Sequence, residues 1–402
     1  MRKFIALILL FYSVTLSAQE KITLLFAGDL MQHKEQISAA RTLDGHYDYS
    51  PCFKLVKTQI SSADLAIANL EVTLGGKPYT GYPAFSAPDE YLAAIKEAGF
   101  DVLLTANNHC LDRRQKGLQR TIMMLDSLHI PHLGTYKDEQ QRQEHYPLLI
   151  CKKGFRIALL NYTFGTNGIK VTPPNVVNYI DRQTISEDIR KAQSWHPDVL
   201  IACMHWGIEY QSLPSREQRE LAHWMIQQGV THIIGSHPHV VQPLEMDNID
   251  GTQHIIVYSL GNFISNMSKI NTDGGLLFTL ELEKPSLPAT AFTKDQTAFH
   301  PSPESEDTLY KAATADTLRC AEKEERERST APTPVRVSHC EYNLVWTARP
   351  RLTGKKNFIL YPVDDPACTL LPAAARNRLN LFTKNARNLF QQHNIRIEER
   401  KK

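Results

Sequence analysis

The stretch Ile233–Val240 reads IIGSHPHV and joins a short apolar run to two histidines on either side of a proline. Pro238 has no backbone N–H and fixes its own φ, so the segment is not expected to continue as a central strand or a helix. We predict a rigid loop that directs His237 and His239 toward one place. Because neutral imidazole is the commonest protein metal ligand, this loop is a candidate metal-binding element.

Polar residues with ligand-type side chains follow each of six apolar runs in the first 282 residues. In an α/β sheet, ligands bind outside the carboxyl ends of the strands, so these side chains are expected to converge on one site. Asp, Glu, Asn and His suit Zn, Mn, Fe or Mg better than thiophilic metals. The runs and the residues after them are Ile22–Phe26 with Asp29, Leu65–Ala68 with Glu71, Val102–Leu104 with Asn107, Asn108 and His109, Val199–Cys203 with His205, His232–Ile234 with His237 and His239, and His254–Leu260 with Asn262.

Each of these residues also has a purely structural interpretation. Asp29 after an apolar run is typical of a turn or a helix N-cap, and Asn107-Asn108 is typical of a turn that tolerates the left-handed conformation. His205 beside Trp206 fits a half-buried core histidine equally well. The recurrence at six strand-like runs favours a shared site, because independent structural roles would not predict it.

Size and composition are those of an ordinary globular chain. Its 402 residues are enough for one large domain with a smaller part, or for two domains. The formal net charge of +2, from 45 basic and 43 acidic residues, gives no argument for a nucleic-acid partner. The seven cysteines form no CxxC pair and are odd in number, so no disulfide framework is expected, although Cys320 and Cys340 could pair.

The N-terminus has the pattern of a secretory signal peptide over residues 1–18. Arg2-Lys3 is the positive region, Phe4–Phe11 is the apolar core, and Ser17-Ala18 is a small-residue end. We therefore expect export across the inner membrane and a periplasmic or cell-envelope location. An uncleaved anchor is the alternative, and only then is membrane association expected; the apolar stretch is short for a span.

Helix-period segments alternate with the strand-like runs. Pro88–Ala98, Gln183–Trp195 and Ser215–Gln228 are predicted helices, and a fourth helical pattern follows the Asn107–Asp112 turn. The alternation predicts an α/β layered domain over residues 21–283. Periodicity alone allows either a doubly wound sheet or a two-sheet arrangement.

The composition changes near Lys284. Residues 284–340 are rich in Pro, Ser, Thr and Ala and contain a charged run without an apolar face, so we predict a partly disordered linker. Beyond it, Tyr342–Ala348 and Asn357–Tyr361 are predicted strands, and Leu371–Phe390 is a predicted helix. Residues 341–402 are expected to form a small C-terminal accessory module.

The ordered motifs FAGDLM, ANLE, TANNH, HWGIEY, GSHPHV and YSLGNF resemble those of the CapA family of poly-γ-glutamate capsule-synthesis proteins, over about residues 23–282. That family is similar to the calcineurin-like metallophosphatases. The resemblance implies a two-sheet β-sandwich flanked by helices, with a site for two divalent metal ions (Mn, Zn, Fe or Mg).

By this resemblance, the metal ligands are Asp29, Glu71, Asn108, His205, His237 and His239, with His109 as the catalytic acid and Asp29 also counted among the catalytic residues. Tyr82, Trp206, Glu209, Tyr210 and Asn262 are candidates for lining the substrate pocket, with local packing as their alternative role. The sequence departs from the phosphatase pattern at three places. Asp29 is followed by no D-x-H histidine and the nearest is His33, the bridging position is Glu71, and the first acidic residue after His109 is Asp112.

Three functions fit these residues. The first is an extracytoplasmic metal-dependent hydrolase in capsule or cell-envelope polymer metabolism, with an acidic or envelope polymer as substrate and the capsule-synthesis machinery as partner. The second is a non-catalytic subunit that binds the polymer or scaffolds a synthase. The third is a phosphoesterase of the nucleotidase type. In the second, the metal site would be degenerate or structural.

Overall fold

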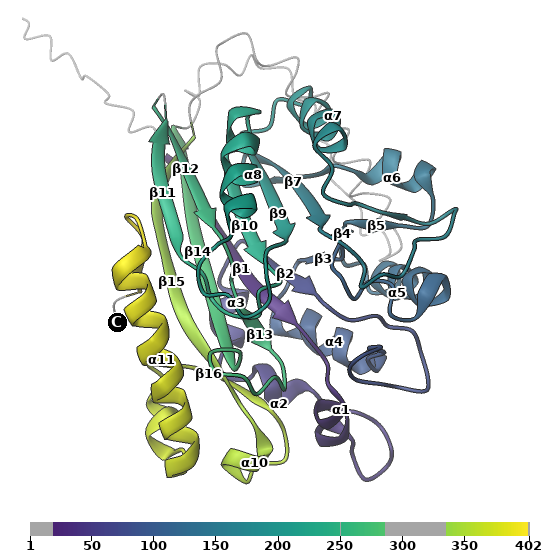
Figure 1. Cartoon of the computed structure of the whole chain (residues 1–402), viewed down its shortest axis with the longest axis vertical. Coiled ribbons are helices and arrows are strands. Elements are labelled where there is room, and N and C mark those ends of the chain that lie inside the picture. The colour runs from purple at the N-terminus through teal and green to yellow at the C-terminus, as the bar shows by residue number, and fades with distance from the viewer. Residues whose placement is uncertain (1–18, 250, 286–334, 401–402) are drawn as a thin grey trace, which may run out of the picture.

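The computed structural model describes residues 19–249, 251–285 and 335–400. The predicted signal peptide (1–18) and most of the predicted linker lie outside the described residues. Two large sheets and surrounding helices make up the described part (Figure 1). The predicted α/β architecture with two sheets flanked by helices is therefore confirmed.

The first sheet has the strand order β16-β15-β14-β1-β2-β3-β4, with β13 beside β1 and β17 beside β15. The neighbours β1, β2, β3 and β4 are parallel, whereas β14, β15 and β16 are antiparallel to their neighbours. The bounds are β16 (Ile359–Pro362), β15 (Arg336–Ala348), β14 (Gly274–Pro285), β1 (Gln19–Leu30), β2 (Leu65–Leu70), β3 (Val102–Leu104), β4 (His132–Leu133), β13 (Asn262–Ile264) and β17 (Glu398–Glu399).

The second sheet has the order β11-β12-β10-β9-β7-β6, and its four central strands are parallel. A short ribbon pairs β5 (Thr135–Tyr136) with β8 (Val176–Val177). The bounds of the second sheet are β11 (Leu244–Ile249), β12 (Thr252–Val257), β10 (His232–Ser236), β9 (Val199–His205), β7 (Phe155–Thr163) and β6 (Leu148–Lys152).

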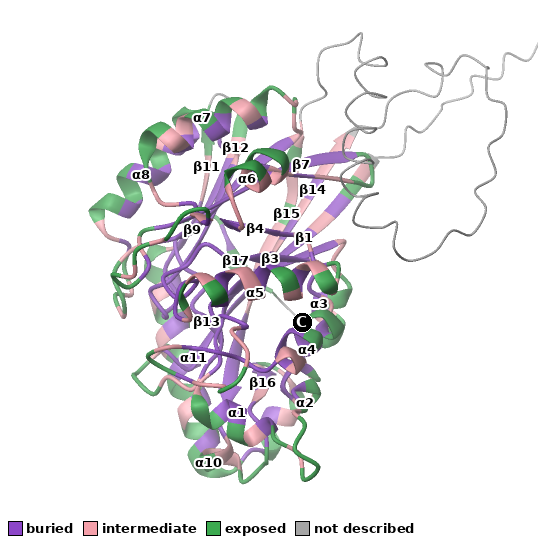
Figure 2. Cartoon of the chain, turned by 90° about the vertical axis from the view of Figure 1, so that its right-hand side faces the viewer, coloured by how far each residue is buried: buried purple, intermediate pink, exposed green. Residues whose placement is uncertain are grey.

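The helices other than α11 cover the outer faces of the two sheets, and the outward sides of the helices are exposed while the strands are largely buried (Figure 2). Helix α4 begins after Pro88 and ends at Gly99, which has a φ of 107°, as the sequence pattern predicted. The bounds are α1 (Lys34–Ala40), α2 (Ser50–Phe53), α3 (Lys57–Ser61), α4 (Asp89–Ala98), α5 (Arg114–Ser127), α6 (Glu139–His145), α7 (Arg182–Gln193), α8 (Arg216–Gln227), α10 (Pro350–Thr353), the 3₁₀ helix η3 (Pro366–Leu370) and α11 (Ala373–His393).

Strand β1 shows why the sheets stack. Successive side chains of a strand point to opposite faces, and here Leu24 and Phe26 enter the core shared with the second sheet while Leu25 and Ala27 enter the core beneath α2 and α4. Because both faces are covered, the strand is a continuous apolar run rather than an alternating one.

The C-terminal residues extend the first sheet. Strand β15 runs antiparallel to β14 from Arg336 to Trp346, and α11 contributes Leu379, Phe382 and Phe390 to the core between the sheets. Residues 336–399 therefore share a sheet and a core with the rest of the chain, whereas the sequence suggested a separate accessory module. The physical reason is that β14 would otherwise be a long unpaired edge.

Two further sequence expectations touch the described residues. No disulfide joins two cysteines of the described ranges, and Cys320, the expected partner of Cys340, lies outside them. Among the helices that the structure describes, none is long and apolar enough to cross a membrane.

Candidate metal centre

The carboxyl ends of β1, β2, β9 and β10 meet at one place between the sheets. The register sets Asp29 of β1 opposite Asn69 of β2, and His205 of β9 opposite Ser236 of β10. Glu71 follows β2 directly, so parallel pairing alone brings it to the same edge as Asp29.

A bulge in β1 turns Asp29 into the site. The register of β1 on β2 shifts between Ala27 and Asp29, and a Cβ on Gly28 would lie 1.9 Å from the carbonyl oxygen of Gly261. Only glycine permits this close approach of the two backbones.

The loop after β10 holds two histidines in uncommon backbone conformations. His237 has a φ of 99° and His239 a φ of 59°, which are strained for residues with a side chain. The backbone N–H of Tyr210 donates to the carbonyl of Pro238 at 2.8 Å and fixes the loop. The tertiary contacts thus stabilise a conformation that directs both imidazoles inward.

Three overlapping groups of side chains have ligand atoms within 4.8 Å of one another. Glu71 belongs to two of them, so its carboxylate lies between a histidine pair and an aspartate–histidine pair. The groups are Glu71 with His205 and His237, Asp29 with Glu71 and His239, and Glu209 with His237 and His239. The structure thus brings together five of the six ligands expected from the family resemblance.

The sixth, Asn108, lies beside this cluster. Its Oδ1 is 2.9 Å from His205 Nε2, and its Nδ2 donates to Asn167. The neighbouring Asn107 instead binds the backbone, donating to Leu70 O at 2.8 Å and accepting from the N–H of His109. Of the two asparagines, Asn107 shapes the turn and Asn108 faces the imidazole.

The cluster contains buried polar atoms without partners among the described residues. Both carboxylate oxygens of Glu71, Oδ2 of Asp29 and Nδ1 of His237 accept or donate no hydrogen bond, and Glu71 is fully buried. Burial, and then the nearby charge of Asp29, raises the pKa of Glu71 well above its ordinary value. An unpaired buried carboxylate costs several kcal/mol, and a divalent cation offsets that cost. The residues present fit a divalent metal ion.

The histidines are poised in the neutral form that binds metals. Burial lowers the pKa of His237 to about 3 and lowers the pKa of His205 well below its ordinary value. The Nδ1 of His205 is 3.1 Å from Ser236 Oγ, which leaves Nε2 directed at Glu71 Oε1, 3.8 Å away. Hydrogen bonds of this kind orient a ligating imidazole.

His239 is oriented in the same way by Asn262. Its Nδ1 is 3.0 Å from Asn262 Oδ1, while its Nε2 is 3.8 Å from Glu71 Oε1. Asp29 Oδ2 is also close, 3.3 Å from His239 Nδ1. Asn262, a candidate substrate contact in the sequence, here contacts a candidate ligand.

His109 has an acidic partner in the structure, although no acidic residue directly follows it in the sequence motif. Its Nδ1 is 2.8 Å from Asp112 Oδ2, and this oxygen also accepts from the backbone N–H of Phe85. The ring of Phe85 lies edge-on to that of His109, with centroids 4.6 Å apart. A residue three positions along the chain thus supplies the carboxylate, because the intervening turn reverses the chain.

The other pocket candidates separate by burial. Trp206 is in the core and donates its indole N–H to Tyr258 O at 3.0 Å, which is a packing role. Tyr82 is largely exposed, with its ring 6.3 Å from that of Phe85. Glu209 is in a ligand group, and the Tyr210 ring is 6.2 Å from that of His239.

Sequence reasoning missed several residues of the site. Phe164 follows β7, is half exposed, and has its ring 4.4 Å from that of His237. Gln32 is fully buried, and neither polar atom of its amide has a partner among the described residues. No motif marks Phe164, whereas the position of Gln32 three residues after Asp29 was a usable signal.

Comparisons with known proteins agree on the family. The model of the family "Bacterial capsule synthesis protein PGA_cap" matches residues 23–267. The chain is 28% identical over 276 residues to the capsule biosynthesis protein CapA of Bacillus anthracis, covering 65% of this chain and 64% of that protein. It is also 28% identical over 276 residues to the PGA biosynthesis protein CapA of Bacillus subtilis strain 168, covering 64% and 67%. The chain thus spans about two thirds of the length of these relatives, and the expected CapA resemblance is confirmed.

Solved structures show only distant likeness. A 5'-nucleotidase from Candida albicans has 12% identity and a TM-score of 0.39, covering 75% of this chain and 57% of its own. The sulfate thiohydrolase SoxB of Thermus thermophilus has 13% identity and a TM-score of 0.35, covering 77% and 62%. Scores this low support no functional conclusion.

Proposed function

This chain belongs to the bacterial capsule synthesis family PGA_cap, and from that premise we propose that it is a metal-dependent hydrolase of capsule or cell-envelope polymer. The observation that carries the proposal is the carboxylate of Glu71, fully buried, without a hydrogen-bond partner in the described residues, and shared by two groups of candidate ligands. Such an arrangement is costly unless positive charge is bound there.

We assign two divalent ions to the two groups that share Glu71. Asp29 and His239 would hold one, and His205 and His237, with Asn108 beside them, would hold the other. Paired divalent ions supply a polarised substrate oxygen and an activated water for hydrolysis. The metal is Mn, Zn, Fe or Mg, in keeping with oxygen and nitrogen ligands.

His109 is the group that would pass a proton to the leaving atom. Asp112 accepts from its Nδ1 and fixes the ring, so that Nε2 is the nitrogen available to the substrate. Phe85 packs on the ring and limits its rotation. The dyad stands beside the ligand cluster, since Asn108 is the residue before His109.

The proposed substrate class is supported by the names of the relatives, which refer to capsule and PGA biosynthesis. We propose a γ-linked glutamyl polymer, or a phosphoester of the envelope, cleaved outside the cytoplasm after export by residues 1–18. The capsule-synthesis machinery is the proposed partner. Membrane association is proposed only for a chain that retains its N-terminal segment.

A phosphoesterase acting on nucleotides is the second candidate. It is favoured by Phe164, whose half-exposed ring stands over the rings of His205 and His237. Aromatic faces of this kind stack on nucleobases. Replacing Phe164 by Ala would then weaken cleavage of nucleotides more than cleavage of a phosphodiester that lacks a base.

The test is metal analysis of the purified full chain, together with assays on poly-γ-glutamate and on bis(p-nitrophenyl) phosphate. The wild type should contain two equivalents of a divalent metal and hydrolyse one of these substrates, and a chelator should abolish the activity. Glu71→Gln should lose at least one equivalent and the activity.

Glu245→Gln is the matched control. Glu245 is also buried, but it is paired with Arg219 and Tyr258 in the second sheet, so metal content should be unchanged. A wild type without metal, or a Glu71→Gln variant with full activity, would refute the metallohydrolase. Bound metal without hydrolysis of either substrate would favour the non-catalytic, polymer-binding alternative.

A further inference from the structure

We propose that helix α11 holds the loop 268–273 against the metal centre so that Lys269 binds a negatively charged group of the substrate next to the bond that is cut. The proposal rests on the proposed function for the place of cleavage. It assigns a role to residues beyond position 267, where the family match ends.

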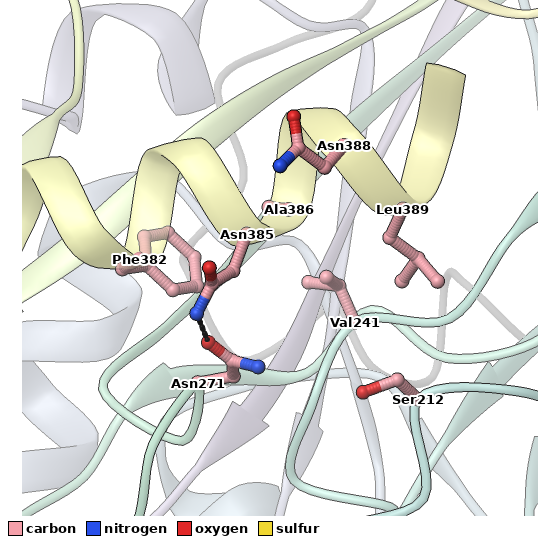
Figure 3. Close-up of a pocket in the computed structure, with 8 residues that line it drawn as sticks. All are labelled: Ser212, Val241, Asn271, Phe382, Asn385, Ala386, Asn388 and Leu389. Atoms are coloured by element: carbon pink, nitrogen blue, oxygen red, sulfur yellow. Dashed lines mark hydrogen bonds between the residues drawn. The ribbon is translucent and has the colours of Figure 1, made fainter. Parts of the chain in front are cut away.

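The loop is attached to α11 by backbone and side-chain contacts. Arg378 donates from Nη2 to the carbonyl oxygens of Ser268 and Lys269 at 3.1 and 3.0 Å, and from Nε to Asp273 Oδ2 at 2.7 Å. Asn385, two turns further along α11, donates to Asn271 Oδ1 at 2.8 Å (Figure 3). Four of the six loop residues are thus held by one helix.

Asp273 fixes the end of the loop to the first sheet. It is buried, and Oδ2 also accepts from the indole N–H of Trp346 in β15 at 3.1 Å. A buried ion pair with Arg378 that is also hydrogen-bonded gives a defined geometry. The C-terminal strand and helix therefore set the position of the loop together.

The same loop reaches the metal centre. The carbonyl oxygen of Thr272 accepts from Asn262 Nδ2 at 2.8 Å, and Asn262 Oδ1 is the atom 3.0 Å from His239 Nδ1. The side chain of Lys269 also lies near the site, because its Nζ is 3.4 Å from the centre of the Tyr210 ring. That ring is 6.2 Å from the ring of His239.

The ammonium of Lys269 is available to a ligand. The residue is exposed, and no described carboxylate lies within ion-pair distance of it. A contact with an aromatic face fixes an ammonium without neutralising it. Lys269 thus places one positive charge at the rim of a centre whose candidate ligands are carboxylates and imidazoles.

The adjoining cavity has no charged side chain that could bind the negatively charged group in place of Lys269. It has a volume of about 220 Å³, opens between α11 and the loop, and offers only uncharged side chains (Figure 3). Its polar members are Ser212, Asn271, Asn385 and Asn388, and its apolar members are Val241, Phe382, Ala386 and Leu389. The cavity therefore supplies no charge that could replace that of Lys269.

Binding is tested with fluorescein-labelled poly-γ-glutamate and with the same polymer whose carboxylates are converted to amides. We expect Lys269→Ala to raise the dissociation constant for the charged polymer about tenfold, to flatten its salt dependence, and to leave metal content unchanged. Lys269→Arg should retain most of the affinity. Lys384→Ala, which removes a charge from the exposed face of α11, should bind as the wild type does.

The variant Arg378→Ala tests whether α11 contributes to substrate binding by positioning Lys269. It should weaken binding to the same extent, and the Lys269→Ala/Arg378→Ala double variant should be no weaker than either single variant, because both remove one interaction. The surface variant Lys269→Ala carries the test alone if Arg378→Ala does not fold.

Equal binding of the charged polymer by wild type and Lys269→Ala would overturn the proposal, as would an equal loss of affinity for the amidated polymer. These readouts are independent of turnover. A protein that binds the charged polymer through Lys269 but does not hydrolyse it would support this inference and refute the hydrolase.

Discussion

Two buried carboxylates of this protein differ in how their charge is satisfied. Asp188 is buried beside Arg142 at 2.7 Å and Tyr162 at 2.9 Å, so its charge is satisfied inside the core. Glu71 is fully buried, and neither of its carboxylate oxygens has a hydrogen-bond partner among the described residues. The contrast separates a structural carboxylate from a functional one, and composition cannot make that distinction.

The His109–Asp112 pair gives the first prediction at this scale. Asp112→Asn keeps an acceptor for the N–H of Phe85 but removes the charge that orients and supports the imidazolium. We expect kcat to fall about 10- to 100-fold, against about 10²- to 10⁴-fold for His109→Ala, with unchanged metal content. Steady-state kinetics and the pH–rate profile check this. An unaltered pH–rate profile in Asp112→Asn would show that Asp112 is only structural.

His232 gives a pH prediction far from the ligands. Burial lowers the pKa of His232 to about 3, below the ordinary value of 6.5, and its Nδ1 accepts from the N–H of Ile255. As the pH falls, His232 is protonated in the unfolded chain before it is protonated in the folded protein. The contribution of neutral His232 to the free energy of unfolding is therefore complete above pH 6.5 and is lost as the pH falls toward 3. The loss is about 1.4 kcal/mol per pH unit.

His232→Asn, which retains an acceptor, should therefore lose stability less steeply than the wild type between pH 6.5 and 4.5. Urea unfolding of chelator-treated protein at several pH values measures the two slopes. Parallel slopes would mean that His232 is protonated in the folded protein.

At the scale of elements, the ends of the parallel strands are the features that the sequence predicted best. Asp29, Glu71 and His205 follow apolar runs, and parallel register places such residues on one edge. The sequence did not predict the close backbone contacts at the strand ends, such as those at Gly28 and Gly235. These contacts depend on which residues of distant segments lie opposite each other.

Gly235→Ala is the prediction for this scale. Its Cβ would lie 2.0 Å from Tyr258 O and 2.5 Å from Trp206 Nε1, so β10 must shift and displace His237 and His239. We expect a loss of about 1–3 kcal/mol in stability and a lower metal content. Thermal unfolding and metal analysis test this, with Gly165→Ala, which meets nothing within 4 Å, as the control. Full metal content in Gly235→Ala would contradict it.

For the molecule as a whole, the two sheets and the C-terminal helix share one core. Phe382 of α11 belongs to the same cluster as Phe26 of β1 and Ile233 of β10. Contacts of this kind couple the folding of distant segments, so the described residues should unfold as one cooperative unit.

Phe382→Ala should lower the free energy of unfolding by about 3–5 kcal/mol and should lower the midpoint for both sheets together. Circular dichroism and tryptophan fluorescence followed in parallel provide the measurement. Two separate transitions, with only one of them shifted, would show that residues 336–399 fold independently of the metal centre.

The sequence by itself determined the α/β class and the family, the two-sheet arrangement followed only from the family resemblance, and the same motifs marked the residues expected as ligands. These depend on local patterns, namely apolar runs, the residues that end them, and glycine and proline positions. Only the tertiary structure decided that the carboxylate of Glu71 has no hydrogen-bond partner among the described residues and that Asp112 pairs with His109. It also decided that β15 extends the first sheet and that α11 holds the loop of Lys269. Such facts depend on which distant segments pack together, and no local pattern encodes that.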